Sequence, residues 1–151
     1  MITIVNAERS DLDEIMEIER SVFSVPWSEN NMLFEIDSDD AFFALAKDNG
    51  RIIGFVVMHG FSDEAEIFNI AVREEYRRRK TGTLLLRNAL ARAEEAGYKK
   101  LYLEVRAGNT AAIEMYKKNG FTLLGVRKGY YDYPKEDALI MMRDMKRGNV
   151  Q

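Results

Sequence analysis

Residues 67–86 read IFNIAVREEYRRRKTGTLLL, an apolar run typical of a β-strand, then a basic turn that contains a glycine, then the start of a helical pattern. The first N–H groups of a helix have no partner within the helix, and the helix dipole makes that end positive. A strand that leads through such a turn into a helix presents backbone N–H groups to a phosphate. We therefore expect a phosphorylated cofactor to bind here.

The basic run from Arg77 to Lys80 has two interpretations. Runs of Arg and Lys are common on solvated surfaces, so composition alone fits an ordinary basic turn equally well. Its position favours anion binding, because it directly precedes an amphipathic helix. The chain has 22 basic and 25 acidic residues and a net charge of −3, which disfavours a general nucleic-acid binder.

A second informative stretch, residues 101–121, reads LYLEVRAGNTAAIEMYKKNGF. It places Glu104, Asn109 and Tyr116 where a strand gives way to a helix. A carboxylate that faces a cleft accepts the proton of an attacking amine, and apolar neighbours raise its affinity for that proton.

Both candidate side chains also have a plain structural interpretation. Glu104 could be an exposed strand residue paired with Arg106 or Lys99. Tyr116 could pack its ring against the sheet, although a packed ring still leaves the hydroxyl free to act.

The amino-acid composition excludes several kinds of site. The 151 residues include no cysteine and one histidine, so disulfides and thiolate metal sites are excluded and we expect no metal. No window approaches the ~20 apolar residues of a membrane span, and the start lacks the features of a signal peptide. We expect a cytoplasmic protein with no membrane partner, either a monomer or a weak dimer.

Two further features receive a structural interpretation. His59 stands at the end of an apolar strand beside a glycine, which favours a hydrogen-bonded structural residue over a catalytic base. The acidic residues Glu35, Asp37, Asp39 and Asp40 are interpreted as a solvated face that could also attract a cationic substrate.

We predict a single domain over residues 1–151 of the α/β class, in the order β-α-α-β-β-β-α-β-α-β-β. Ser10 and Ser28 are predicted to cap the first two helices, and Gly97 to end the third. The predicted strands span residues 2–5, 41–46, 51–59, 64–72, 101–105, 121–130 and 138–145. The predicted helices span 10–23, a short segment after 28, 83–96 and 109–118.

Residues 77–82 resemble motif A of the GCN5-related N-acetyltransferases (GNAT family), in which Arg/Gln-x-x-Gly-x-Gly/Ala follows a strand. Arg77 and Gly82 match this pattern, and Lys80 stands where the family usually has its first glycine. If φ of Lys80 is negative, its N–H can still donate at little loss. If φ is positive, lysine costs about 1 kcal/mol and weakens cofactor binding.

Within that family the chain most resembles the ribosomal-protein-alanine N-acetyltransferases, the RimI type. Four blocks carry this resemblance in order and spacing: FNIAV at 68–72, LEVRAGN at 103–109, AI-x-x-Y at 112–116, and YY at 130–131 with EDA at 136–138. The resemblance implies a central splayed mixed sheet flanked by helices, with acetyl-CoA as cosubstrate in the gap between the splayed strands.

The resemblance also implies roles for individual residues. Glu104 would be the general base, Tyr116 the general acid for the departing thiolate, and Asn109 a cofactor contact. The backbone of Ile70, Ala71 and Val72 would pair with the pantetheine arm as an added strand does. The pyrophosphate would lie at the turn formed by Arg77, Arg78, Arg79, Lys80, Thr81, Gly82 and Thr83.

The pKa of the acceptor amine helps to decide between an N-terminal α-amine and a lysine side chain. An α-amine has a pKa of about 7.8 and a lysine amine about 10.4, so deprotonating lysine at pH 7 costs roughly 3.5 kcal/mol more. One carboxylate therefore suits an N-terminal amine better, and the resemblance implies the N-terminal alanine of a small-subunit ribosomal protein. Transfer would be direct, because no cysteine can carry the acetyl group.

Two alternatives stay open. One is acetylation of a small amine or polyamine, and the other is a non-catalytic module that senses acetyl-CoA. Phe23, Pro26, Trp27, Tyr130, Tyr131 and Tyr133 could wall a groove for a peptide end. The rival interpretation of these aromatic residues is that they stabilise loops.

Overall fold

The computed structural model describes residues 1–145. The strands are β1 (Ile2–Asn6), β2 (Ala41–Asp48), β3 (Arg51–Phe61), β4 (Glu64–Val72), β5 (Lys100–Arg106), β6 (Thr122–Tyr131) and β7 (Glu136–Asp144). The helices are α1 (Leu12–Val22), α2 (Glu29–Asp37), α3 (Thr81–Ala96) and α4 (Thr110–Lys118), with 3₁₀ turns η1 (Arg9–Asp11) and η2 (Glu74–Tyr76). The order confirms the predicted α/β class. The last part of the predicted domain, residues 146–151, lies outside the described residues.

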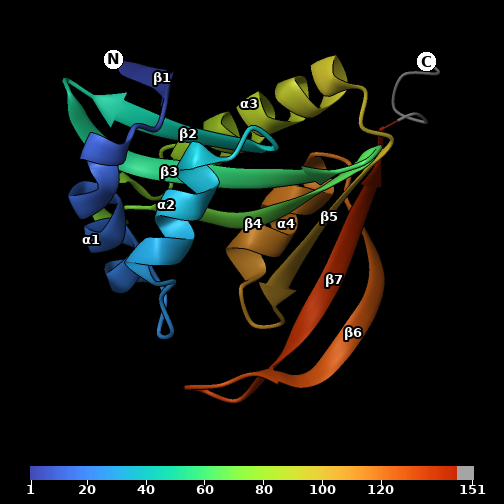
Figure 1. Cartoon of the computed structure of the whole chain (residues 1–151). Helices are drawn as coiled ribbons and strands as arrows, with labels where there is room; N and C mark the ends of the chain where they lie inside the picture. The colour runs from blue at the N-terminus through green and yellow to red at the C-terminus, as the bar shows by residue number, and fades with distance from the viewer. Residues whose placement is uncertain (146–151) are drawn as a thin grey trace.

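One seven-stranded sheet organises the chain, in the order β1-β2-β3-β4-β5-β7-β6. Its neighbours are antiparallel except for β4 and β5, which are parallel. Helices α1 and α2 cover one face over the N-terminal strands, and α3 and α4 pack on the other face (Figure 1). The first of these faces is left without a helix over β5, β7 and β6.

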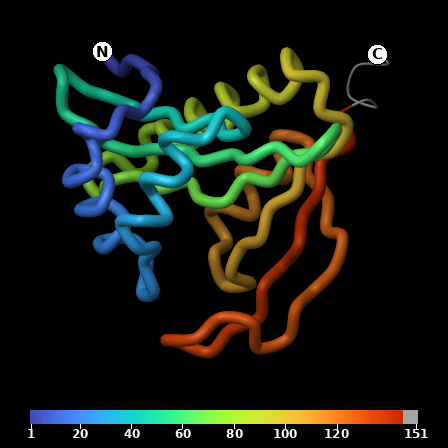
Figure 2. Tube along the Cα trace, in the orientation of Figure 1, coloured from blue at the N-terminus to red at the C-terminus, as the bar shows by residue number. Residues whose placement is uncertain are grey.

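The parallel pair splays apart. Pairing between β4 and β5 runs from Glu64–Lys100 to Ile67–Leu103 and then ends, while β4 stays paired with β3 as far as Val72. The part of the sheet formed by β1 to β4 consequently diverges from the part formed by β5, β7 and β6 (Figure 2). This confirms the splayed sheet that the family resemblance implies.

A β-bulge lies where the splay begins. Val57 pairs with Asn69 and Met58 with Ile67, so Phe68 has no partner on β3. Phe68 packs on the cluster beneath α1 and α2, and Asn69 donates to Glu19 of α1, so two consecutive side chains point to the same face. The bulge thereby sets which side chains face the gap.

The helix caps agree with the sequence in part. Ser28 caps α2 by accepting a hydrogen bond from Asn31 N at 3.1 Å, and Gly97 ends α3 with φ 78°, both as predicted. The predicted cap at Ser10 is wrong. Ser10 lies inside η1, and the capping box is formed by Glu8 and Asp11.

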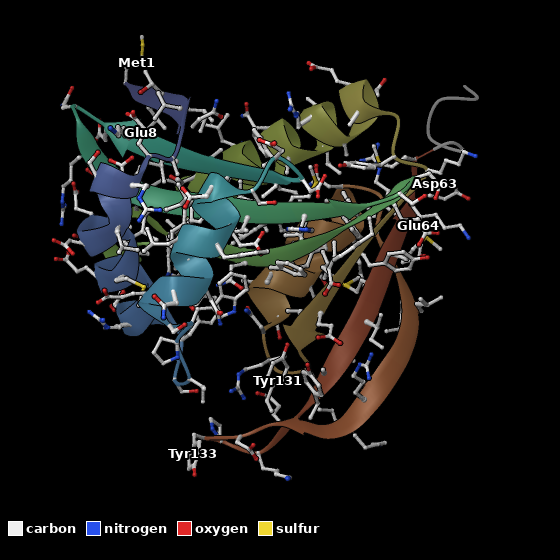
Figure 3. The ribbon with its side chains drawn as sticks, viewed as in Figure 1. Met1, Glu8, Asp63, Glu64, Tyr131 and Tyr133 are labelled. Atoms are coloured by element: carbon white, nitrogen blue, oxygen red, sulfur yellow. The ribbon has the colours of Figure 1, made fainter. Side chains whose placement is uncertain are left out.

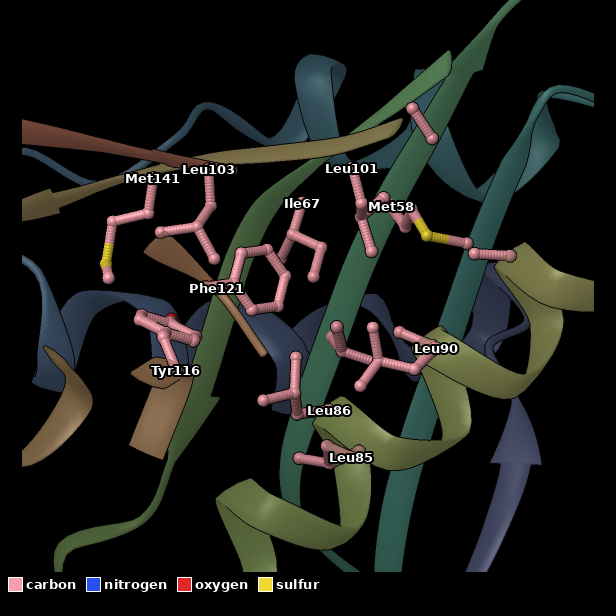
Figure 4. Packing of buried hydrophobic residues seen from close by; sticks show 14 of the residues in the cluster. Met58, Ile67, Leu85, Leu86, Leu90, Leu101, Leu103, Tyr116, Phe121 and Met141 are labelled. Carbon is pink, nitrogen blue, oxygen red and sulfur yellow. The ribbon is translucent and has the colours of Figure 1, made fainter. Parts of the chain in front are cut away.

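The core on the α3 face holds the turn before α3 in place. Leu85 and Leu86 of α3 are fully buried, in the same core cluster as Ile67 of β4 (Figure 4). Burying a leucine stabilises the fold by roughly 1.5–3 kcal/mol, so this packing holds the start of α3 against the sheet.

Candidate active site

The turn between β4 and α3 has a left-handed backbone at two non-glycine residues. Lys80 has φ 63° and ψ 15°, and Arg78 has φ 66°. The second alternative for Lys80 therefore holds, and the lysine carries a backbone cost of about 1 kcal/mol. The helix begins at Thr81, not at Thr83 as predicted, because Lys80 already acts as its N-cap.

The start of α3 offers free hydrogen-bond donors. The first helical bond joins Leu84 N to Lys80 O at 3.0 Å, so the N–H groups of Thr81, Gly82 and Thr83 have no carbonyl within the helix. Thr81 Oγ1 is the buried side-chain N or O atom that lacks a hydrogen-bond partner within residues 1–145. A phosphate oxygen at this turn would satisfy these donors.

Space and charge at the turn also fit a phosphate. A Cβ at Gly82 would stand 3.4 Å from Met115 Sδ and 3.9 Å from Val72 Cγ2, so the missing side chain leaves room between β4 and α4. Across the described part of the chain, the basic residues Arg77 to Lys80 form no salt bridge. The Arg79 guanidinium lies over the Tyr76 ring, 5.3 Å from its centroid. The turn is thus a cationic cradle without a carboxylate of its own.

The open edge of β4 leads from this turn to the gap. Residues 70–72 pair with β3 on one side and, within the described part of the chain, have no strand on the other, since pairing with β5 has already ended. Ile70 and Val72 pack on the α3 core, and Ala71 on the α1 core. Their side chains are structural, and their backbone groups remain available for an extended ligand.

Glu104 lies on β5, one residue beyond the last pair with β4. Its side chain is 23% exposed, and its carboxylate accepts a hydrogen bond from Arg127 Nε at 2.7 Å. The sequence offered Arg106 or Lys99 as an ion-pair partner of Glu104, and both are wrong. Lys99 pairs with Asp63, and Arg106 pairs with Glu136. Nothing in the local sequence signals Arg127, which comes from β6.

A pocket of about 390 Å³ opens beside Glu104. Among the residues predicted to wall the acceptor groove, Phe23, Trp27, Tyr130 and Tyr131 line it, and Pro26 and Tyr133 do not. The other lining residues are Glu19, Val25, Glu66, Ile67, Phe68 and Asn69. The structure thus brings together residues from the loop after α1, from β4 and β5, and from the final hairpin.

The aromatic walls also support one another. Tyr130 and Tyr131 contact edge to face with centroids 5.1 Å apart, and Trp27 lies 5.7 Å from Phe68 of the bulge. The two interpretations of these residues are therefore compatible, since the contacts that stabilise the loops also shape the pocket.

Glu19 of α1 is a buried carboxylate that the sequence analysis did not assign to the site. It accepts hydrogen bonds from Trp27 N and from Asn69 Nδ2, both at 2.9 Å. Burial raises the pKa of Glu19, and the two hydrogen bonds oppose this in part. Glu19 ties the Trp27 loop to the bulge; the available signal was a glutamate on the apolar face of a helix.

Arg106 joins the two loops that flank the pocket. Its guanidinium donates to Ser24 Oγ at 3.3 Å, to Asp132 O at 3.0 Å and to Pro134 O at 2.9 Å. It also lies 4.5 Å from the centroid of the Tyr131 ring. Tyr131 is thereby held at the pocket, whereas Tyr133 stands at the tip of the hairpin (Figure 3).

Tyr116 of α4 has its ring in the core, 5.8 Å from that of Phe121 (Figure 4). Burial is the main reason that the pKa of Tyr116 is raised, and the neighbouring Tyr131 adds to it. Tyr116 therefore keeps its proton at neutral pH.

Asn109 caps α4 by accepting a hydrogen bond from Ala112 N at 3.3 Å, and the helix begins one residue later than predicted.

Residues 12–121 match the model of the acetyltransferase (GNAT) family. This chain belongs to the GNAT family. The [ribosomal protein bS18]-alanine N-acetyltransferase of Escherichia coli (strain K12) is 37% identical over 143 residues, covering 93% of this chain and 96% of the relative.

Two solved structures agree with this assignment. The ribosomal-protein-S18-alanine N-acetyltransferase from Escherichia coli has a TM-score of 0.90 at 35% identity, covering 96% of this chain and 94% of that one. Ard1 from Thermoplasma volcanium has a TM-score of 0.86 at 27% identity, covering 95% and 97%. The resemblance and the splayed fold are confirmed, and the chain is an N-acetyltransferase.

In this GNAT enzyme His59 is buried and has a hydrogen-bond partner, as its structural interpretation predicts. Its Nδ1 lies 2.6 Å from Oε1 of Glu35, and its ring contacts those of Phe61 and Phe68 at 4.9 and 5.8 Å. The interpretation of Glu35 as part of a solvated face is wrong, because Glu35 is buried. Its acidic neighbour Asp37 is exposed and pairs with Arg9.

Residues 1–145 contain no group of three or more His, Asp or Glu side chains arranged to hold a metal ion. No helix in that range is long and apolar enough to cross a membrane.

Proposed function

We propose that this N-acetyltransferase transfers acetyl from acetyl-CoA to the N-terminal alanine of ribosomal protein bS18, in the cytoplasm. The observation that carries the proposal is the pocket beside Glu104, whose aromatic walls suit a peptide end, at the mouth of the splayed strands. The Escherichia coli relatives are bS18-alanine N-acetyltransferases, which supports the choice of acceptor.

The chain's own groups can hold the donor. The donor supplies an acetyl thioester and a pyrophosphate. The N–H groups of Thr81, Gly82 and Thr83, with the basic side chains before them, suit the pyrophosphate. Ile70 to Val72 offer a free strand edge to the pantetheine arm, which directs the thioester towards Glu104.

Two side chains carry out the proton transfers. Glu104 accepts the proton that the α-amine loses as it bonds to the acetyl carbon, and Arg127 holds the carboxylate in place. Tyr116 donates its proton to the thiolate that leaves, since its raised pKa keeps that proton available. Asn109 positions the start of α4, which carries Tyr116.

An α-amine suits this machinery better than a lysine amine. At pH 7 a lysine amine requires roughly 3.5 kcal/mol more than an α-amine for deprotonation. A peptide end also uses the aromatic walls, which a small polyamine cannot fill.

The test is an acetylation assay with mass mapping. The amino-terminal hexapeptide of bS18 should accept one acetyl group on its α-amine. The same peptide with a blocked N-terminus and an internal lysine should react at least tenfold more slowly, and so should spermidine. Faster reaction of either competitor would overturn the proposed acceptor, and a stable acetylated enzyme would overturn direct transfer.

A further inference from the structure

Glu66 lines the acceptor pocket and has neither a hydrogen bond nor an ion pair within the described residues. It lies on β4, half-buried, opposite His59 of β3 and Tyr102 of β5. Within residues 1–145 its carboxylate makes no hydrogen bond and no ion pair. A half-buried carboxylate without a partner is costly unless a ligand supplies one.

The other two carboxylates of the pocket are already satisfied. Glu104 has Arg127, and Glu19 has the Trp27 and Asn69 donors. No lysine or arginine is among the lining residues. Glu66 is therefore the pocket carboxylate that lacks a direct partner among residues 1–145, and Arg127 counters its charge only in part.

The electrostatics of Glu66 agree with this. Burial raises the pKa of Glu66, the negative charge of Glu104 adds to it, and Arg127 opposes it in part. A cation from a ligand would counter both unfavourable effects.

The register places Glu66 away from the reacting amine. Tyr102 is opposite Glu66, and Glu104 follows two residues later, which is about 7 Å further along the strand towards the gap. An extended acceptor advances about 3.3 Å per residue. If its α-amine lies at Glu104, a side chain from its second or third residue reaches Glu66.

The neighbours of Glu66 suit a long cationic side chain. Phe68 lies two residues further along the same strand, on the same face, and Tyr102 is the partner of Glu66 on β5. Aromatic rings beside a carboxylate hold the alkyl stem of Lys or Arg while the carboxylate binds its charged end.

We infer that Glu66 is a specificity-determining residue that binds a Lys or Arg side chain at the second or third position of the acceptor. This rests on the proposed function, because it requires the acceptor to be a peptide whose α-amine reacts at Glu104.

The test compares three peptides that begin with alanine and differ only at positions two and three: one carries Arg there, one Gln and one Glu. The wild-type enzyme should favour the Arg peptide over the Gln peptide by about tenfold in kcat/KM, through KM, as expected for a charge-assisted contact. Glu66→Gln should abolish that ratio, and Glu66→Lys should favour the Glu peptide.

Glu64→Gln is the matched control, because Glu64 lies two residues away on the same strand and does not line the pocket. It should keep the wild-type ratio. An equal rate for all peptides with the wild-type enzyme would overturn the inference and leave the proposed function intact. A uniform loss of rate with Glu66→Gln would assign Glu66 a catalytic or structural role instead. Failure of the wild-type enzyme on every peptide would overturn both.

Discussion

Arg127 Nε on β6 donates a hydrogen bond of 2.7 Å to Glu104 Oε2 on β5, although β7 lies between these two strands in the sheet. The arginine side chain therefore crosses β7 to reach the proposed base. Tyr130, next to this pair, has its pKa raised chiefly by the negative charge of Glu104. The final hairpin thus contributes both a wall of the pocket and the cation that orients the carboxylate.

Removing this cation should slow the reaction through Glu104. Arg127→Gln is expected to lower kcat roughly tenfold, because a charge-assisted hydrogen bond no longer fixes the carboxylate. Glu104→Gln should lower kcat by ~10² or more. The double variant should be no slower than Glu104→Gln alone, since Arg127 then has nothing to orient. Independent, multiplying losses in steady-state kinetics would contradict this coupling.

Tyr116→Phe tests the proposed acid. The variant should lower kcat by ~10², because phenylalanine keeps the ring but has no proton to donate to the leaving thiolate. The raised pKa of Tyr116 keeps its hydroxyl protonated, so the wild-type rate should show no alkaline loss from this group up to about pH 10. Tyr133→Phe is the control, because Tyr133 is 79% exposed at the hairpin tip. Equal rates for the two variants would remove the role of Tyr116.

The left-handed backbone at Lys80 predicts a gain in stability on substitution. Lys80→Gly should raise the free energy of unfolding by about 1 kcal/mol, because glycine adopts φ 63° without strain. Arg77→Gly is the matched control. Arg77 has φ −68°, so glycine there should lower stability through chain entropy. Urea denaturation measures both; a loss of stability with Lys80→Gly would contradict the strain.

Particular residues show which contacts can be predicted from the sequence and which cannot. Apolar patterns with turn and cap residues predicted the strands and α-helices. Glu104 followed from its place at the end of a strand and from the resemblance, and the aromatic walls followed from the positions of these residues in the sequence. The contact of Glu104 with Arg127 joins residues 23 positions apart, and that of Glu19 with Asn69 joins residues 50 apart. No local propensity encodes such pairs. They depend on the bulge and on strand register, which only the assembled sheet defines.

The sequence left the sign of φ at Lys80 open for a related reason. Local sterics favour negative φ for a lysine, so the conformation is imposed by the ends of β4 and α3 that the turn must join. The cap at Glu8 escaped prediction for the opposite reason. Ser10 is the better cap by propensity, but the capping box between Glu8 and Asp11 provides two hydrogen bonds where one serine would provide one.

Glu19 should make stability depend on pH. Its carboxyl has a raised pKa in the folded protein, so the folded state keeps this proton while the unfolded state loses it above the ordinary value of 4.5. Between these two pKa values the folded state binds more protons, and stability therefore falls as pH rises. Glu19→Gln removes the titration but keeps an acceptor for Trp27 N. The free energy of unfolding of the wild type, relative to this variant, should decrease as pH increases above 4.5 and then level off. Urea denaturation across pH 4 to 8 measures the difference, and a difference that rises with pH would show that the two hydrogen bonds outweigh burial.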